Sequence, residues 1–242
     1  MSLLDYDALT FDCYGTLIDW ETGLLRAIAD ALPEEDRPAD EVLETFGRFE
    51  SEEETAAPAL PYPKILGRVL LRLADAWGLG VPPGSAEAFG ASVGSWPAFS
   101  DSPQALQVLK RHYRLVILSN VDRASFRASQ RRLGVDFDFV FTAQDIGSYK
   151  PDPRNFEHML EKLATERIAR DRILHTAQSL HHDHVPAARL GLATCWIDRR
   201  HAKPGWGATV APGEKVEVTY RFPSLAEMAT AVETEVLSLP SE

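Results

Sequence analysis

The sequence predicts an α/β protein with helices on both faces of a parallel sheet and an all-helical cap inserted after the first strand. Short, continuously apolar runs recur along the 242-residue chain and alternate with helical periodicities. Continuous rather than alternating apolarity is typical of strands that are buried on both faces. Residues 19–98 interrupt this alternation with helical patterns and no convincing strand, which predicts the insertion.

The core is expected to comprise residues 1–18 and 99–242. Its expected strands are, in chain order, 8–11, 115–118, 137–141, 173–174 and 193–197. Its helices carry recognisable end signals. Pro103 follows Ser102 at the start of one helix, and Gly134 ends the helix predicted over 122–133. A further helix is expected around 156–163, and Ser224 with Glu227 forms a capping box before the last helix, 224–237.

The cap is expected to span residues 19–98. Helical periodicity predicts helices over 21–32 and 64–77, whereas 33–40 and 56–63 have the composition of loops. The acidic run from Glu50 to Glu54 is expected to form a solvated helix face, because charge runs of this kind usually face water.

Composition limits the partners. A formal charge of −11 argues against a nucleic-acid or anionic-membrane partner, since such polyanions bind clustered Lys and Arg. The longest apolar runs are too short to span a bilayer, and the first residues do not resemble a signal peptide. Cys13 and Cys195 both lie in expected strands, so we expect buried thiols in a reducing compartment. The expected location is the cytoplasm.

Polar side chains follow several of the expected strands. In open α/β sheets, ligands bind beyond the carboxyl ends of the strands. An isolated Asp at such a place is commonly a turn or cap residue. Here several polar residues converge on one edge, which indicates a site composed of Asp12, Ser119, Asn120, Lys150, Ser179 and Asp183.

The same residues carry a resemblance to a known family. Asp12-Cys13-Tyr14-Gly15-Thr16-Leu17, followed by Ser119-Asn120, Lys150-Pro151 and Asp183, resembles the four motifs of the haloacid dehalogenase superfamily. The segment 191–199 makes the chain most similar to the L-2-haloacid dehalogenase branch. The resemblance implies a Rossmann-like three-layer core with a helical cap, and hydrolytic removal of halide from a halogenated carboxylic acid.

The chemistry of position 14 separates this reading from a phosphatase. Phosphatases of the superfamily use a second Asp there as the acid that protonates the leaving alkoxide, whereas this chain has Tyr14, and the pKa of a free Tyr is about 10. Halide leaves without a proton. Phosphatases also commonly place a metal-binding Asp where this chain has Ser179, so Mg²⁺ would lack oxygen ligands. We expect no metal and no cofactor.

The expected mechanism is covalent. Asp12 attacks carbon 2 of a 2-haloalkanoate, halide leaves, and water hydrolyses the aspartyl ester. Lys150 keeps Asp12 anionic, Ser119 and Thr16 hold its oxygens, and Asp183 orients or activates the water. By resemblance to the cap arginine of these dehalogenases, Arg48 is expected to bind the substrate carboxylate. The full expected substrate-binding set is Tyr14, Thr16, Arg48, Asn120, Phe156 and Ser179, with Trp20 as a further apolar wall.

The chain departs from the family pattern in two places. Phe156 stands where these dehalogenases have Tyr, and Gln178 and Leu180 replace a Ser and an Asn of the fourth motif. A zinc site built from His181, His182 and His184 is the less favoured alternative, because adjacent histidines on a helix point in different directions. A Mg²⁺-dependent phosphatase and a catalytically silent binding protein stay open, as does a homodimer.

Overall fold

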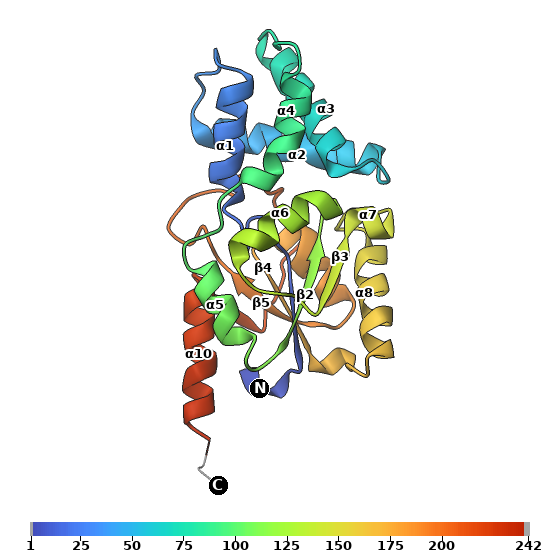
Figure 1. The fold of residues 1–242 in the computed structure, drawn as a ribbon, viewed down its shortest axis with the longest axis vertical. Helices are drawn as coiled ribbons and strands as arrows, with labels where there is room; N and C mark the ends of the chain where they lie inside the picture. The colour runs from blue at the N-terminus through green and yellow to red at the C-terminus, as the bar shows by residue number, and fades with distance from the viewer. Residues whose placement is uncertain (1, 240–242) are drawn as a thin grey trace.

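The computed structural model describes residues 2–239 and confirms the α/β fold. Six parallel strands form one sheet in the order β3-β2-β1-β4-β5-β6 (Figure 1). Central β1 pairs with β2 on one side and β4 on the other, with Thr10 opposite both Val116 and His175. The strands are β1 (Ala8–Phe11), β2 (Arg114–Ser119), β3 (Phe139–Thr142), β4 (Ile173–Ala177), β5 (Ala193–Ile197) and β6 (Tyr220–Phe222).

Two helical layers cover the sheet. Leu9 and Phe11 pack into the same apolar cluster as residues of α5, α6 and α10, whereas Ala8 packs into a second cluster with residues of α8 and α9. Alternate side chains of β1 therefore serve opposite faces, and both faces are apolar. The core helices are α5 (Ser102–Leu109), α6 (Arg123–Leu133), α7 (Ala143–Ile146), α8 (Pro153–Thr165), α9 (Val185–Arg189) and α10 (Leu225–Leu237).

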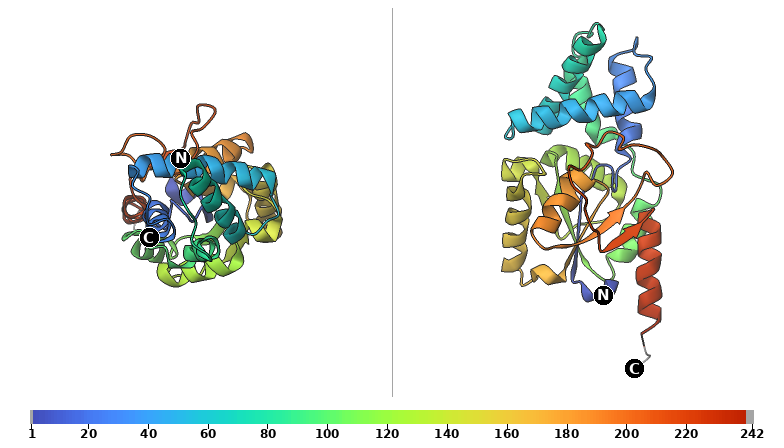
Figure 2. Two further views of the ribbon diagram at one scale, coloured as in Figure 1. Left: turned by 90° about the horizontal axis from the view of Figure 1, so that it is seen from above. Right: turned by 180° about the vertical axis from the view of Figure 1, so that it is seen from behind.

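Four α-helices form the cap above the carboxyl end of the sheet (Figures 1 and 2). They are α1 (Trp20–Ala31), α2 (Ala39–Ala56), α3 (Tyr62–Trp77) and α4 (Ser85–Ala91). The chain enters and leaves the cap as two paired segments, in which Asp19 N–H donates to Pro97 O at 2.8 Å and Phe99 N–H donates to Leu17 O at 3.1 Å. This pairing supports the division at 19–98, which we keep as a proposal.

Some elements differ from expectation. The sequence analysis did not anticipate β6, an edge strand of which two of three residues are half-buried and which therefore lacks the continuous apolar signal. Helix α2 replaces the end of the loop expected over 33–40. Short one-turn elements complete the chain: η1 (Leu3–Asp5), η2 (Ser92–Ser95), η3 (Arg170–Arg172) and η4 (Leu180–His184), of which η4 is a π-helical turn.

The acidic run is only partly solvated, so the expectation of a fully exposed helix face is wrong. Glu50 is 4 % exposed and Glu54 is 5 % exposed, whereas Glu52 faces water. Glu50 and Glu54 are spaced four residues apart and continue the buried stripe that contains Phe46. Residues at this spacing lie on one helix face, so two carboxyl groups of the acidic run are buried with the apolar side chains of that face.

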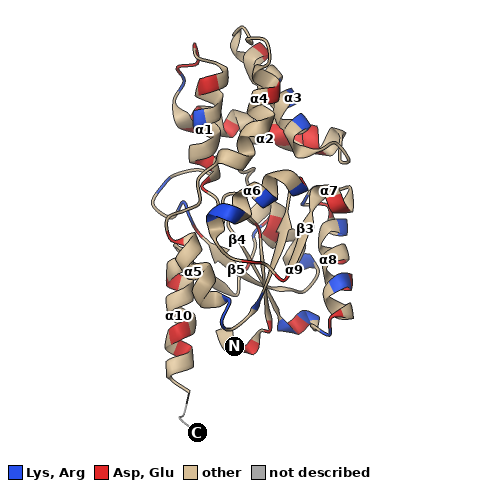
Figure 3. Ribbon diagram, viewed as in Figure 1, with Lys and Arg blue, Asp and Glu red and all other residues tan. Residues whose placement is uncertain are grey.

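Charges are otherwise distributed over the outer surface. Figure 3 shows Lys and Arg interspersed with Asp and Glu on the peripheral helices, with no broad basic face in that view. Within residues 2–239, none of the helices is long and apolar enough to cross a membrane.

The loop between β5 and β6 fastens the cap to the core. Arg200 in this loop contacts both Glu21 of α1, at 2.6 Å, and Asp40 of α2, at 3.3 Å. Ala208 of the same loop lies so close to α2 that a Cβ added to Gly47 would stand 2.1 Å from its carbonyl oxygen. Only a residue without a side chain allows this contact between helix and loop.

We therefore expect Gly47→Ala to destabilise the protein. Ala is intrinsically a better helix former than Gly, but its methyl group would displace the backbone of Ala208. Overpacking of this kind costs about 1–3 kcal/mol of stability. Chemical denaturation would measure the loss. Gly80→Ala is the matched control because a Cβ at Gly80 would meet nothing within 4 Å. Equal stability of the two variants would contradict this close approach.

Candidate active site

Asp12 is the first residue after β1 and begins a tight loop beneath the cap. The amides of Leu17 and Ile18 both donate to Cys13 O, at 2.8 and 2.9 Å, which closes the loop. Gly15 turns the chain with a φ of +91°, a conformation that other residues rarely adopt. Thr16 Oγ1 then donates to Asp12 Oδ2 at 2.8 Å and orients the carboxylate.

Lys150 links the two acidic residues of the site. Its Nζ lies 2.9 Å from Asp12 Oδ1, 2.6 Å from Asp183 Oδ1 and 2.9 Å from Leu118 O. An ammonium has three N–H donors, so all three are used. Asn120 positions the Lys150 backbone by accepting from its N–H at 2.6 Å and donating to its carbonyl at 2.9 Å.

A buried chain of hydrogen bonds supports Asp183 from below. His175 Nε2 lies 3.0 Å from Asp183 Oδ1, and His175 Nδ1 lies 2.8 Å from Thr10 Oγ1. The ring of Phe156 packs edge-on against His175, with centroids 4.9 Å apart. The sequence analysis did not assign this role to His175. The parallel register of β1 and β4 creates it, because Thr10 and His175 are directly paired.

The pKa values follow from burial and from Lys150. Burial raises the pKa of Asp12, and the Lys150 ammonium and the Thr16 hydroxyl offset only part of the rise. For Asp183, burial would also raise the pKa, but Lys150 and His175 prevail and lower it. Two carboxylates raise the pKa of Lys150 despite its burial, so it stays charged.

A small cavity of about 40 Å³ lies over Asp12. Several buried polar atoms have no hydrogen-bond partner among the described residues, and four of their residues line the cavity: Ser119 (Oγ), Trp20 (Nε1), His182 (Nε2) and Asp183 (Oδ2). Unpaired buried polar groups are costly and commonly mark a place where a ligand or water binds. The lining residues are Asp12, Tyr14, Trp20, Glu50, Glu54, Tyr62, Ser119, Asn120, Lys150, Ser179, His182 and Asp183.

Ser179 holds His182 by two contacts. Ser179 Oγ accepts from the His182 backbone N–H at 3.0 Å and lies 3.2 Å from His182 Nδ1. Burial, and then His181, lower the pKa of His182 to about 3, which keeps the ring neutral. His182 Nε2 has no partner among the described residues, as is true of Trp20 Nε1 and Ser119 Oγ.

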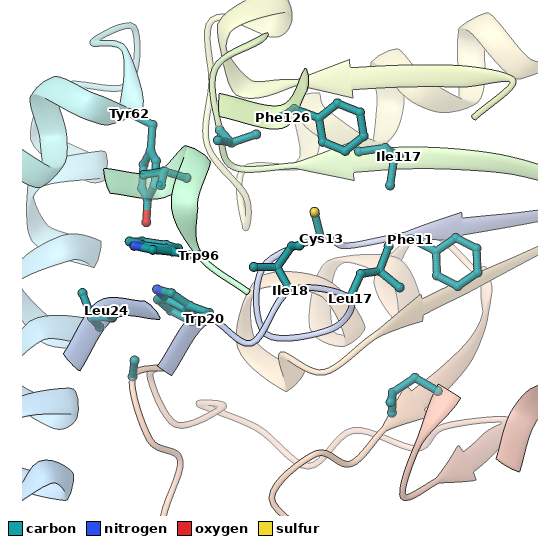
Figure 4. Close-up of a cluster of buried hydrophobic side chains, with 14 of the residues drawn as sticks. Phe11, Cys13, Leu17, Ile18, Trp20, Leu24, Tyr62, Trp96, Ile117 and Phe126 are labelled. Carbon is teal, nitrogen blue, oxygen red and sulfur yellow. The ribbon is translucent and has the colours of Figure 1, made fainter. Parts of the chain in front are cut away.

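The cap closes the cavity with acidic and aromatic side chains. Glu50 and Glu54 of α2 and Tyr62 of α3 line it. Tyr62 Oη donates to Glu50 Oε1 at 2.6 Å, and Asn120 Nδ2 donates to Glu54 Oε2 at 3.2 Å. Figure 4 shows Tyr62 and Trp20 extending into the same region between cap and core. The i,i+4 continuation of the apolar stripe is the sequence signal that could have revealed the two glutamates.

Most predicted site residues lie together, but three do not line the cavity. Thr16 is fully buried and contacts the site through its hydrogen bond to Asp12 Oδ2. Phe156 is fully buried behind His175. The expected placement of Arg48 is wrong: its side chain is 60 % exposed, lies over the Phe49 ring and pairs with Glu52 at 3.9 Å. Within α2, Arg48 falls on the solvent side because it is two residues before buried Glu50.

Gln178, which replaces a Ser of the fourth motif, forms hydrogen bonds to two loops. Gln178 N–H donates to Thr16 Oγ1 at 2.9 Å, and Thr209 Oγ1 donates to the Gln178 side chain at 3.3 Å. Gln178 thus connects the loop that begins at Asp12 with the loop between β5 and β6. The part of the chain that the structure describes contains no group of three His, Cys, Asp or Glu side chains able to hold a metal ion.

The sequence matches the family of haloacid dehalogenase-like hydrolases over residues 6–175, and the chain belongs to this family. Its fold is similar to that of the L-2-haloacid dehalogenase from Xanthobacter autotrophicus, with a TM-score of 0.76 at 18 % identity, over 94 % of this chain and 98 % of the other.

Two curated relatives resemble part of the chain. The (S)-2-haloacid dehalogenase of Pseudomonas sp. (strain YL) is 35 % identical over 104 residues, which are 42 % of this chain and 43 % of the relative. The pyrimidine 5′-nucleotidase YjjG of Escherichia coli (strain K12) is 26 % identical over 109 residues, 44 % and 47 % of the two chains. The chain thus spans less than half the length of these two relatives.

We expect Lys150→Met to destabilise the protein. Two buried carboxylates would lose their cation, and breaking a buried pair in this way costs about 3–5 kcal/mol. Calorimetry would measure the loss. Lys162→Met, on the exposed face of α8, is the control. A Lys150 variant as stable as wild type would contradict the central role of its ammonium.

The buried carboxyl of Glu50 makes stability depend on pH. Burial raises its pKa from 4.5 to about 8, with the Tyr62 hydroxyl partly opposing the rise. Between these two pH values, Glu50 is ionised in the unfolded chain and protonated in the folded protein. The free energy of unfolding therefore falls as pH rises, by at most about 1.4 kcal/mol per pH unit.

Urea unfolding of wild type and Glu50→Gln across this pH window measures the effect. The stability difference between the two proteins should shift in favour of the variant as pH rises. Glu52→Gln, an exposed site on the same helix, should show no such trend. A pH-independent difference between wild type and Glu50→Gln would exclude a raised pKa at Glu50.

Proposed function

We propose that the protein is a hydrolytic dehalogenase that acts on a small organic molecule with a halogen at carbon 2, and that Asp12 is the nucleophile. The names of the dehalogenase relatives indicate 2-haloalkanoic acids as the substrate class. The observation that carries the proposal is the bridge of Lys150 between Asp12 and Asp183, because it places an ammonium against the buried carboxyl group of Asp12 beside a cavity and opposes the rise in pKa that burial causes.

The first step is substitution at carbon. Asp12 Oδ1 is bonded to Lys150 and Oδ2 to Thr16, so the carboxylate is oriented before the substrate arrives. Its oxygen attacks carbon 2, and the electron pair of the carbon–halogen bond leaves with the halide. The unpartnered donors of Trp20 and Ser119 supply neutral hydrogen bonds for the negative charge that develops in the cavity.

The second step is ester hydrolysis. Asp183 Oδ1 is held by Lys150 and His175, but Oδ2 has no partner among the described residues. This free oxygen can orient a water toward the aspartyl ester. Hydrolysis restores Asp12, forms the hydroxyl product and releases a proton, so that one water and one halogenated molecule yield one alcohol, one halide and one proton.

The similarity to a nucleotidase makes a phosphatase the rival reading. Two observations disfavour it. Tyr14 donates or accepts a hydrogen bond at Ser129 Oγ, 2.9 Å away, and burial raises its pKa well above the usual value, so it is a poor acid for an alkoxide. Mg²⁺ is also disfavoured, because Ser179 takes the place of an acidic residue and the Lys150 ammonium already bonds Asp12 Oδ1 and Asp183 Oδ1.

The complete charge network favours an enzyme over a silent binding protein. A buried, desolvated Lys with two carboxylates is expensive to maintain, and simple ligand binding does not require it. The prediction is that the protein releases chloride from L-2-chloropropionate in the presence of EDTA, and that Asp12→Asn does not.

A single turnover in ¹⁸O-labelled water distinguishes the covalent route. Hydrolysis at the ester carbonyl would leave the label in Asp12, detected by peptide mass spectrometry. Product that carries the label while Asp12 stays unlabelled would show direct attack by water instead. Mg²⁺-dependent phosphate release from p-nitrophenyl phosphate, with no halide from any halogenated substrate, would establish the phosphatase.

A further inference from the structure

The cavity contains no cation that is free to bind an anionic substrate. Lys150 is the one Lys or Arg among the lining residues that the structure describes, and its three N–H donors already bond Asp12, Asp183 and Leu118. Arg48 points to solvent. Four residues with carboxyl groups also line the cavity: Asp12, Asp183, Glu50 and Glu54.

The cavity is lined by both acceptors and donors: Glu50 and Glu54 of α2 offer carboxyl oxygens, and Trp20 of α1 and Ser119 of β2 offer N–H and O–H groups. Tyr62 and Asn120 each donate one hydrogen bond to the glutamates, which leaves further carboxyl lone pairs available. Ser119 and Trp20 are at least nine-tenths buried, and their Oγ and Nε1 atoms have no partner among the described residues. His182 is half-buried, and its Nε2 atom likewise has no partner there. A ligand that fits must therefore both donate and accept hydrogen bonds.

We propose that Glu50 and Glu54 select a substrate that carries a neutral carboxamide, rather than a carboxylate, on the carbon bearing the halogen. The inference rests on the proposed dehalogenase function. The amide N–H groups donate to the cap glutamates, and the amide carbonyl accepts from the unpartnered donors. A carboxylate has no N–H to offer and places a further negative charge beside the four carboxyl groups.

The balance of the reaction is that of the proposed function. Asp12 forms a bond to carbon 2 and halide leaves with its electron pair; water then cleaves the ester. A 2-haloamide and one water yield a 2-hydroxyamide, a halide and a proton. The carbonyl next to the reacting carbon, which activates substitution, is present in the amide as in the acid.

The protonation of the glutamates separates the two substrates. An ionised carboxylate and a protonated carboxylic acid both have an oxygen that accepts from an amide N–H, so the amide fits either state. A substrate carboxylate fits only when Glu50 or Glu54 carries a proton to donate. The preference for the amide over the carboxylate substrate should therefore increase as pH rises.

Polar, charged and titratable groups surround the pair on several elements. Tyr62 on α3 bonds Glu50, and Asn120 after β2 bonds Glu54. Burial raises the pKa of Glu54 well above its usual value, Glu50 raises it further, and Lys150 opposes the rise. Tyr14, Tyr149, His182, Asp12 and Asp183 are the remaining titratable groups at the cavity or electrostatically linked to the pair.

The test compares 2-chloropropanamide with 2-chloropropanoate, which have nearly the same shape. Halide release should give a kcat/KM ratio, amide over acid, that rises by roughly tenfold or more from about pH 6 to about pH 9. The ratio cancels the ionisation of Asp12, since both substrates need it. Glu50→Gln with Glu54→Gln should make the ratio independent of pH by raising activity on the acid.

Glu52→Gln is the matched control, because this glutamate lies on the same helix but faces solvent. It should reproduce the wild-type pH profile. Preference for the acid at every pH in the wild type would overturn the inference while leaving the dehalogenase function intact. A rising ratio that survives in the double variant would equally overturn the role of the glutamates.

A binding measurement keeps the inference testable without turnover. Lactamide and lactate are the unreactive hydroxy products of the two substrates. Ligand-observed NMR on wild type at about pH 9 should detect lactamide but not lactate. Preferential binding of lactate would refute the inference. Absence of halide from both chlorinated compounds, together with selective lactamide binding, would instead refute the proposed reaction alone.

Discussion

The site depends on one buried ammonium shared between two carboxylates. Lys150 is 1 % exposed and joins the end of β1, through Asp12, to the π-helical turn after β4, through Asp183. Removing three charges from water is costly, and the cost is offset only where every partner is well placed. Here the carbonyl of Leu118 takes the third N–H, and Asn120 holds the Lys150 backbone. The Lys150 ammonium offsets part of the rise in the pKa of Asp12 that burial causes, and the proposed chemistry depends on this effect.

The polar contacts around this bridge explain its rigidity. Thr16 connects Asp12 to Gln178, and His175 connects Asp183 to Thr10 in the centre of the sheet. Each carboxylate thus has at least one bond to a residue on another strand or loop. Such preorganisation lowers the reorganisation needed during reaction, because the groups already face the place where charge develops. Four of the buried polar atoms left unpaired among the described residues, by contrast, belong to residues that line the cavity where a ligand would bind.

The cap determines what the cavity admits. Helices α2 and α3 of the cap add two carboxyl groups and a phenol to the cavity, opposite a core that supplies Asp12, the proposed nucleophile. The loop between β5 and β6 fixes α2 in place through Arg200 and through the close approach of Gly47 to Ala208. A change in a loop far along the sequence can therefore alter the substrate-binding wall without touching Asp12.

The sequence alone determined five of the six strands of the sheet and the order of the motifs that follow them. Continuous apolar runs predicted β1, β2 and β5 almost to the residue, because strands buried on both faces leave a strong local signal. The positions of Asp12, Lys150 and Asp183 after strands were likewise local properties. Edge strand β6, the role of His175, the burial of Glu50 and Glu54 and the exposure of Arg48 were decided only by tertiary structure. Each depends on which helix face or strand neighbour packs against which partner, and that choice is made by contacts between residues distant in the chain.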